Sequence, residues 1–241
     1  MTRFSTSENI KRDLVLANRI LAHEGVIDGF GHVSVRNPDV PERYFLARSR
    51  SPELVELDDI LEFTLAGQPI DAPNPALYAE RAIHGAIYQV RPDVNAIGHH
   101  HTRAVLPFTV AKVPLKPLFH MAAIIGETVP LWDSQPEFGD TNMLVDDLAK
   151  GRSLASALGH GRVALLRGHG AVVVGETMAH MVLTSIYLKE NAELALQARQ
   201  LGDLHYLTPG EVQKTSDLMR GQLPLNRAWE YYIARAGFRG M

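Results

Sequence analysis

Three consecutive histidines follow a short apolar segment near the middle of the chain. The run of histidines 99–101 comes directly after residues that suit a buried strand, among them Val94 and Ile97. Alternate side chains of a strand share a face, so we expect His99 and His101 on one face and His100 on the other. Two neighbouring imidazoles at a strand end form half of a divalent-metal site, and other segments must supply the remaining ligands. A solvent-exposed histidine run is the alternative.

The composition restricts the classes of protein and of site. The 241 residues are 46% hydrophobic and 21% charged, which predicts one ordinary globular domain spanning residues 1–241. The net charge of −3, without a dense Lys/Arg block, argues against nucleic acid or an anionic membrane as a partner. The chain has no cysteine, so histidines and carboxylates are the available metal ligands. The N-terminus does not resemble a signal peptide, and we expect a cytoplasmic protein.

Hydrophobic periodicity predicts an α/β fold with a mixed sheet that helices cover on both faces. A first helix should end at Gly25, and a C-terminal helical tail should begin near residue 208. Further helices are predicted at about 75–89, starting at Asn74–Pro75, and at 102–110, 142–158 and 177–201. Strands are predicted at 33–36, 44–47, 59–64, 68–70, 96–102, 115–118, 129–131, 163–166 and 171–174.

Two further residues are candidates to complete the metal site. His169 lies between Gly168 and Gly170 at the turn of two apolar strands, where glycine permits a tight backbone. Three imidazoles leave coordination positions open for a substrate, as in catalytic metal sites, although a structural histidine in a hairpin is the alternative. Glu80, on the predicted helix, is a candidate fourth ligand or acid/base group, against the alternative of a solvated helix face.

Four separate motifs resemble those of class II aldolases in the L-fuculose-phosphate aldolase/adducin superfamily. They are Glu80-x-x-x-His84, Arg91–Pro92–Asp93, His99-x-His101 and residues 165–170. The resemblance covers roughly residues 8–200 and implies an α/β/α sandwich with a central, mainly antiparallel sheet. It also implies a homotetramer with sites near subunit interfaces, a divalent metal on His99, His101 and His169, and Glu80 as the acid/base.

The chain departs from the superfamily at the phosphate-binding positions of the sugar-phosphate aldolases. Small hydroxyl and glycine-turn residues there are replaced by Gly31–His32, Arg48–Ser49 and Tyr78–Ala79. Guanidinium groups pair bidentately with planar carboxylates, and aromatic side chains face aromatic rings. We therefore expect substrate-binding roles for His32, Arg48, Ser49, Arg50 and Tyr78, with a surface ion pair as the alternative for either arginine.

The whole sequence, including residues 31–36 and 119–122, resembles the branch of hydroxylated aromatic dicarboxylate decarboxylases, whose members act on dihydroxyphthalate or 3-hydroxy-2-methylpyridine-4,5-dicarboxylate. The predicted function is therefore metal-dependent cleavage of a C–C bond next to a metal-chelated oxygen, with an aromatic carboxylate as substrate. Glu80 is the predicted proton donor and His120 its competitor. The metal is Mn, Zn, Fe or Co, which imidazole ligands do not distinguish. The alternatives are an aldolase acting on a hydroxy-oxo acid or a sugar phosphate, and a non-catalytic adducin-like scaffold.

Overall fold

Eight strands form one continuous sheet in the computed structural model, which describes residues 6–70 and 75–237. The strands are β1 (His32–Arg36), β2 (Arg43–Ala47), β3 (Ile60–Thr64), β4 (Pro69–Ile70), β5 (Ala96–His100), β6 (Leu131–Trp132), β7 (Val163–Leu166) and β8 (Gly170–Gly175). Their order is β4-β3-β2-β1-β5-β8-β7-β6. Each neighbouring pair is antiparallel except β6 and β7, which are parallel. The predicted mixed, mainly antiparallel sheet is confirmed.

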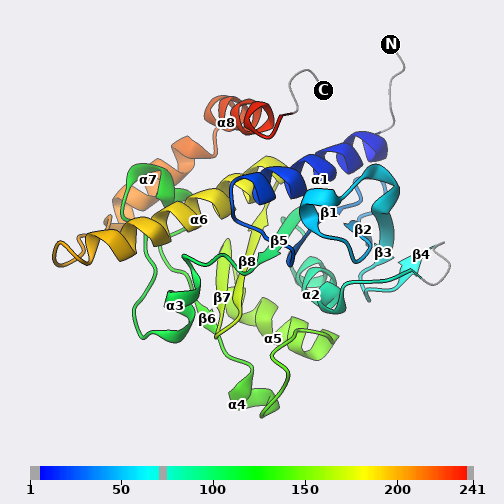
Figure 1. Cartoon of the computed structure of the whole chain (residues 1–241), viewed down its shortest axis with the longest axis horizontal. Coiled ribbons are helices and arrows are strands. Elements are labelled where there is room, and N and C mark those ends of the chain that lie inside the picture. Colours follow the sequence, from blue (N-terminus) through cyan, green and yellow to red (C-terminus); the bar gives the residue numbers. More distant parts are fainter. Residues whose placement is uncertain (1–5, 71–74, 238–241) are drawn as a thin grey trace.

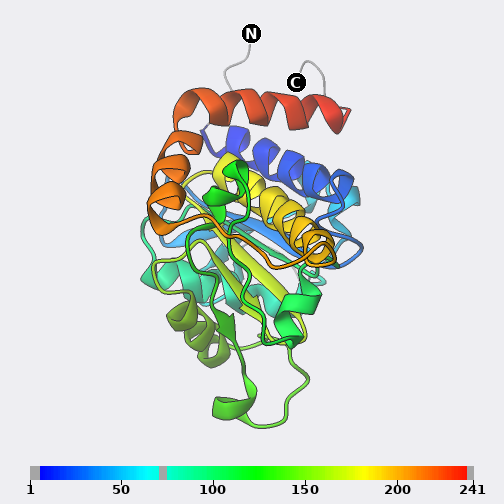
Figure 2. The same ribbon diagram turned by 90° about the vertical axis from the view of Figure 1, so that its left-hand side faces the viewer.

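Helices cover both faces of this sheet (Figures 1 and 2). They are α1 (Thr6–His23), α2 (Ala82–Val90), α3 (Leu106–Val110), α4 (Gln135–Phe138), α5 (Leu148–Leu158), α6 (Met178–Ala198), α7 (Pro209–Met219) and α8 (Gln222–Arg235). Helices α1 and α6 lie on one face, α2 and α5 lie on the other, and α8 crosses the outer side of α1 and α6 (Figure 2). The chain is thus an α/β/α sandwich, and no helix in its described part is long and apolar enough to cross a membrane.

The strands contribute side chains to two hydrophobic cores, one on each side of the sheet. In β8, Ala171 and Val173 belong to the core under α1 and α6, whereas Val172 and Val174 belong to the core under α2 and α5. This alternation is the two-residue period of a strand that is buried on both faces. It also fixes which way the histidines at the end of the neighbouring strand β5 point.

The strand predicted at 115–118 is absent, and that prediction is wrong. Pro117 has no N–H to donate to a sheet, which disfavours a central strand. The side chain of Asn191 on α6 satisfies the neighbouring backbone instead, because it accepts from Leu118 N (2.9 Å) and donates to Lys116 O (2.9 Å). The segment therefore belongs to no sheet.

The helix predicted at 142–158 begins only at Leu148. The side chain of Asn142 accepts a hydrogen bond from Leu144 N (3.0 Å), and Met143 adopts a positive φ of 66°. Such local side-chain bonds compete with helix formation, so the helix starts later, where Asp147 caps it by accepting from Lys150 N. The helix predicted at 75–89 similarly begins at Ala82, behind a 3-10 turn at Ala79–Arg81. The predicted start at Asn74 lies outside the described residues.

Candidate metal centre and active site

Four candidate ligands converge at one end of the sheet. One ligand atom each from Glu80, His99, His101 and His169 lies within 4.8 Å of all the others. The Nε2 atoms of His99 and His101 are 3.2 Å apart, and Glu80 Oε2 lies 3.4 Å from Nε2 of both His99 and His169. Ligands that bind one tetrahedral zinc-like ion at about 2.1 Å are separated by about 3.4 Å. The donor set therefore fits a divalent transition-metal ion.

His99 and His101 are brought together by the alternation of β5. His99 is fully buried, and its Nδ1 donates to Ala171 O of β8 at 3.1 Å, which leaves Nε2 free for a ligand. His100 points to the opposite face, where its Nδ1 bonds to Thr102 Oγ1 at 2.7 Å. The Thr102 hydroxyl in turn donates to Val26 O at 2.7 Å. As predicted, the middle histidine does not belong to the cluster.

His169 reaches the cluster from the turn between β7 and β8. Gly168 has a φ of +62°, a conformation that L side chains rarely adopt. A Cβ at Gly170 would lie 2.3 Å from His100 O, so only glycine allows this close approach of the turn to β5. The Nδ1 atom of His169 is buried and has no hydrogen-bond partner among the described residues.

Glu80 lies in the 3-10 turn before α2. The sequence had predicted that it lies within the helix. Its backbone is non-helical (φ −90°, ψ 21°), and its Oε1 accepts a hydrogen bond from Val145 N at 2.9 Å. Burial alone would raise the pKa of this carboxyl, but the charges and hydrogen bonds of His99 and His169 lower it well below its usual range. The carboxylate is therefore held ionised and fixed in orientation.

Two of the three consecutive histidines, His100 and His101, favour the neutral form. Burial, followed by the neighbouring His99 and His169, lowers the pKa of His101 to about 4. Burial likewise lowers the pKa of His100 to about 3. A neutral imidazole has a free lone pair, so the chain presents His101 in the form that ligates metals.

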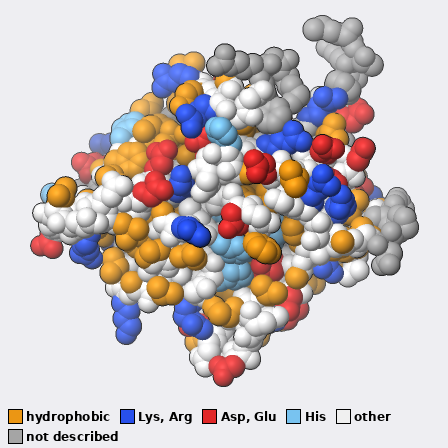
Figure 3. Space-filling view, in the orientation of Figure 1, with side chains coloured by type: hydrophobic (Ala, Val, Ile, Leu, Met, Phe, Trp, Pro, Cys, Tyr) orange, Lys and Arg blue, Asp and Glu red, His pale blue; other side chains and the backbone are white. Residues whose placement is uncertain are grey.

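A cavity of about 450 Å³ lies beside the four ligands. In the space-filling view, histidine side chains gather near the middle of the face shown (Figure 3). The cavity is lined by four of the five predicted substrate residues, together with Glu80, His101 and His169. Those four are His32, Ser49, Arg50 and Tyr78. Its volume lies within the roughly 300–1,000 Å³ that is typical of small-molecule sites.

Arg48 and Arg50 share one carboxylate but only Arg50 lines the cavity. Arg48 Nε lies 2.7 Å from Asp59 Oδ1, and Arg50 Nε lies 3.0 Å from Asp59 Oδ2. The two Nη groups of Arg50 form no hydrogen bond with a described residue, so its charged fork is available to a ligand. The prediction that Arg48 or Arg50 faces the pocket is met by Arg50, whereas Arg48 does not line this cavity of its own chain and its substrate-binding role stays a prediction.

His120 lies outside this cavity of its own chain. The expected strand end is absent, and the residue begins the 3-10 helix His120–Ile125 with its side chain exposed. Within one chain, the geometry therefore does not place His120 beside Glu80.

His32 and Tyr78 form an aromatic wall of the cavity. The ring centroids of His32 and Tyr78 are 4.8 Å apart, and the centroid of His32 lies 5.2 Å from that of His99. The Tyr78 hydroxyl donates to Arg50 O, which ties the wall to the loop that carries the arginine. An aromatic ring could stack between this wall and the metal ligands.

Sequence inspection missed several cavity residues, among them Phe30 and Leu144, and one backbone donor. Phe30 is 75% exposed and Leu144 half-buried, and both line the cavity. Phe30 stands between two glycines, which was the available signal for an exposed aromatic side chain at a turn. Nothing in the local sequence indicates that Val145 N–H orients Glu80, because that contact joins segments 65 residues apart.

Comparison with known proteins agrees with this geometry. Residues 12–196 match the family model of the class II aldolase and adducin N-terminal domain. The chain belongs to this family. Decarboxylase tropJ from Talaromyces stipitatus is 30% identical, over 95% of this chain and 95% of that protein. The 3,4-dihydroxyphthalate decarboxylase of Arthrobacter keyseri is 29% identical, over 95% of each chain.

The fold is that of solved class II aldolases. The structure of L-fuculose 1-phosphate aldolase from Glaciozyma antarctica superposes with a TM-score of 0.77, at 23% identity, over 98% of this chain and 96% of that one. The family match, together with decarboxylases that align over nearly the full length, identifies this class II aldolase family member as a lyase.

Proposed function

We propose that the protein is a metal-dependent decarboxylase of a hydroxylated aromatic dicarboxylate, with a benzene or pyridine ring. The observation that carries the proposal is one cavity that joins the Glu80–histidine cluster to the open guanidinium of Arg50 and the aromatic wall of His32 and Tyr78. The full-length relatives named as decarboxylases support this choice of reaction.

The three histidines and Glu80 would hold the divalent ion. When bound, the ion would act as a Lewis acid and stabilise the negative charge that develops on a neighbouring substrate oxygen. Mn, Zn, Fe and Co all suit three imidazoles and a carboxylate. We propose His99, His101 and His169 as the permanent ligands, because each offers a ring nitrogen to the same point.

Arg50 would bind the carboxylate that the reaction retains. Its Nε lies 3.0 Å from Asp59 Oδ2 and donates a hydrogen bond to Leu54 O at 2.6 Å. These contacts fix the side chain and leave its Nη groups available to a ligand. A guanidinium held in this way is preorganised for a bidentate carboxylate contact. His32 and Tyr78 would face the ring, and the exposed Ser49 at the cavity edge would contact a polar substituent.

Glu80 would move the proton that the reaction requires. When CO₂ leaves, its bonding electron pair stays on the ring carbon, which must then gain a proton. The ionised carboxylate can accept the proton that a phenolic hydroxyl loses on binding and return it to that carbon. The isolated position of His120 within the chain supports Glu80 over His120 for this role.

The test is CO₂ release from a panel of hydroxylated benzene and pyridine dicarboxylates by protein reconstituted separately with each metal. Sugar phosphates and non-phosphorylated hydroxy-oxo acids form the second panel. Decarboxylation in the first panel supports the proposal, whereas efficient cleavage in the second panel alone would establish an aldolase. A metal-loaded protein that turns over neither panel would favour the adducin-like scaffold.

We further propose that residues 1–241 act as one domain in a cytoplasmic homotetramer. Helix α8 carries exposed apolar side chains, with Leu223 83% and Tyr231 54% exposed, which suit a subunit contact. Light scattering coupled to size exclusion tests the assembly, and a single calorimetric unfolding transition tests the single domain. Fractionation of the source cells tests the compartment.

A further inference from the structure

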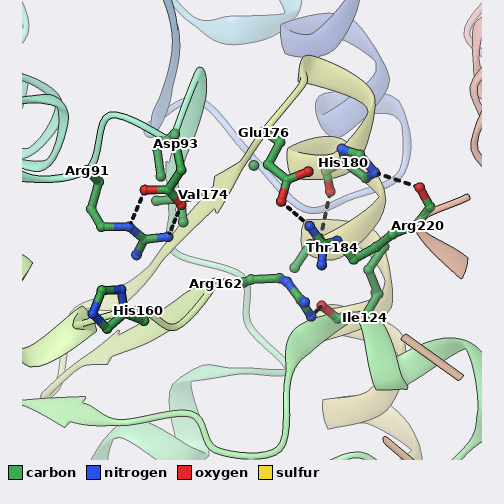
Figure 4. Close-up of a pocket in the computed structure, with 12 residues that line it drawn as sticks. Arg91, Asp93, Ile124, His160, Arg162, Val174, Glu176, His180, Thr184 and Arg220 are labelled. Atoms are coloured by element: carbon green, nitrogen blue, oxygen red, sulfur yellow. Dashed lines mark hydrogen bonds and ion pairs between the residues drawn. The ribbon is translucent and has the colours of Figure 1, made fainter. Parts of the chain in front are cut away.

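A second, cationic cavity lies at the opposite end of β5 and β8 from the metal cluster. It has a volume of about 160 Å³, and Val94, just before β5, lies on its wall. His99 follows Val94 by five residue steps of extended chain, a distance of about 17 Å. Basic side chains from four segments enter this cavity (Figure 4), namely Arg91, His160, Arg162, His180 and Arg220.

The guanidinium of Arg91 already has hydrogen-bond partners within the chain. Its Nε and Nη2 bond to the two carboxylate oxygens of Asp93 at 2.8 and 2.7 Å. Its Nη1 donates to Gly159 O at 2.6 Å and Gly161 O at 3.1 Å. The charge is paired with Asp93 and four of the five N–H donors are occupied, so Arg91 has a structural role.

Arg162 differs from Arg91, because its side chain is half-buried and most of its N–H donors have no partner among the described residues. Only its Nη1 has partners, Ile124 O at 3.0 Å and Ser216 Oγ at 2.9 Å, and both are neutral. Three of its five N–H donors, on Nε and Nη2, make no hydrogen bond to the described part of the chain. A desolvated charge without a counterion is unfavourable, and an external anion would remove that penalty.

Arg220 adds a second positive group that faces Arg162. Figure 4 shows Arg162 between Arg91 with His160 on one side and Arg220 with Glu176 on the other. Arg220 forms an ion pair with Glu176, and His180 Nε2 donates to Arg220 O at 3.3 Å, which anchors its main chain.

The charges around Arg162 do not cancel. Burial and then Arg220 lower the pKa of Arg162, while the more weakly acting Glu176 and Asp217 raise it. With Arg91 paired to Asp93 and Arg220 paired to Glu176, one positive charge, that of Arg162, has no counterion among the described residues.

We propose that this cavity binds a small inorganic oxyanion, which Arg162 holds through its open Nε and Nη2 edge. A guanidinium edge matches two oxygens of phosphate or bicarbonate, and Arg220 and His160 line the other walls. The volume is below the roughly 300–1,000 Å³ of sites for larger organic ligands, which selects a small anion. Such a ligand would join the turn before β5, the start of β7, α6 and α7, and would therefore stabilise the fold. The inference is independent of the proposed decarboxylation.

The experiment measures the thermal midpoint of the full chain in phosphate, in bicarbonate and in chloride, at matched pH and ionic strength. We expect phosphate or bicarbonate to raise the midpoint by about 2–5 °C over chloride once the anion greatly exceeds its Kd. The anion that raises the midpoint identifies the ligand. No rise with either oxyanion over chloride would overturn the proposal.

Matched variants assign the effect to this cavity. Arg162→Gln should abolish the rise, whereas Arg152→Gln removes the same charge from the exposed side of α5 and should keep it. If the oxyanion-induced rise in the thermal midpoint is lost equally in both variants, the effect is a general one of charge and the proposed site is contradicted. If Arg162→Gln does not fold, Arg162→Lys keeps the charge but not the planar edge, and calorimetric titration should then show Kd raised about tenfold or more. An unchanged Kd in Arg162→Lys would also contradict it.

Discussion

The imidazoles of His32 and His84 are joined by a hydrogen bond of 2.6 Å between Nδ1 of His32 and Nε2 of His84, beneath the wall of the candidate active-site cavity. The chain of contacts continues from His84 Nδ1 to Ser34 Oγ at 2.6 Å and from Ser34 Oγ to the Tyr88 hydroxyl at 2.9 Å. These four side chains are buried, so each proton is shared with a neighbour and not with water. Whether His32 donates or accepts toward the cavity is therefore coupled to Ser34 and Tyr88.

The first prediction concerns stability and pH. Burial, then His99, lowers the pKa of His84 to about 3, whereas an unfolded histidine titrates near 6.5. As pH falls below 6.5, the unfolded chain binds a proton that folded His84 does not, so stability decreases until about pH 3 and is fully retained above 6.5. The contribution is about 1.4 kcal/mol per pH unit. Denaturant titrations of metal-free protein should therefore give a shallower pH slope for His84→Gln, and an identical slope would contradict the assignment.

The second prediction concerns the metal. His101→Ala should lower the bound metal to a small fraction of one equivalent and abolish activity, while the circular dichroism of the fold is kept. His100→Asn is the matched control, since His100 points to the other face: it should cost stability and retain metal. Elemental analysis after dialysis measures both. Full activity in a metal-free His101→Ala protein would eliminate the site.

The third prediction separates the two arginines. Arg50→Gln should reduce kcat/KM by the equivalent of about 1–3 kcal/mol, chiefly through KM, because a charged contact to the substrate carboxylate is lost. Arg48→Gln removes the same charge and a bond to the same Asp59. Because Arg48 lies outside the cavity, this substitution should change KM much less. Steady-state kinetics of the two variants would show the reverse order if Arg48 were the substrate ligand.

The fourth prediction concerns the proton. Glu80→Gln keeps an oxygen that can accept from Val145 N–H, so we expect metal and substrate binding to persist while most of kcat is lost. In the native enzyme, solvent deuterium should appear on the product at the carbon that lost CO₂. His120→Ala should turn over nearly normally. If the His120→Ala variant is inactive and the Glu80→Gln variant is active, the proton transfer belongs to the histidine.

Sequence patterns predicted the parts of the site that depend on local periodicity. The two-residue period of β5 put His99 and His101 on one face, and the glycines around His169 indicated a tight turn. The same patterns could not place Arg48 and Arg50. Both lie in one polar loop, and their difference arises from the tertiary position of Asp59.

Long-range contacts explain two further differences, at Glu80 and at residues 115–118, whereas the late start of α5 arises from the local hydrogen bond of Asn142. The helical pattern around Glu80 is genuine, but the carboxylate is bound by Val145 N–H and faces two histidines, and the backbone adopts a 3-10 turn there. The apolar residues near 115 suit a strand, yet their backbone partner is the side chain of Asn191 on α6. No local window of sequence contains either partner.

The ligands come from distant parts of the chain, which sets the order in which the protein can mature. On the ribosome, a nascent chain that ends before β8 contains Glu80, His99 and His101, but not the strand that holds His99 through Ala171 O. The third imidazole, His169, emerges just ahead of that strand. Tight uptake of the proposed ion would therefore require the pairing of β5 with β8, so that acquisition of the ion would mark the completion of the central sheet.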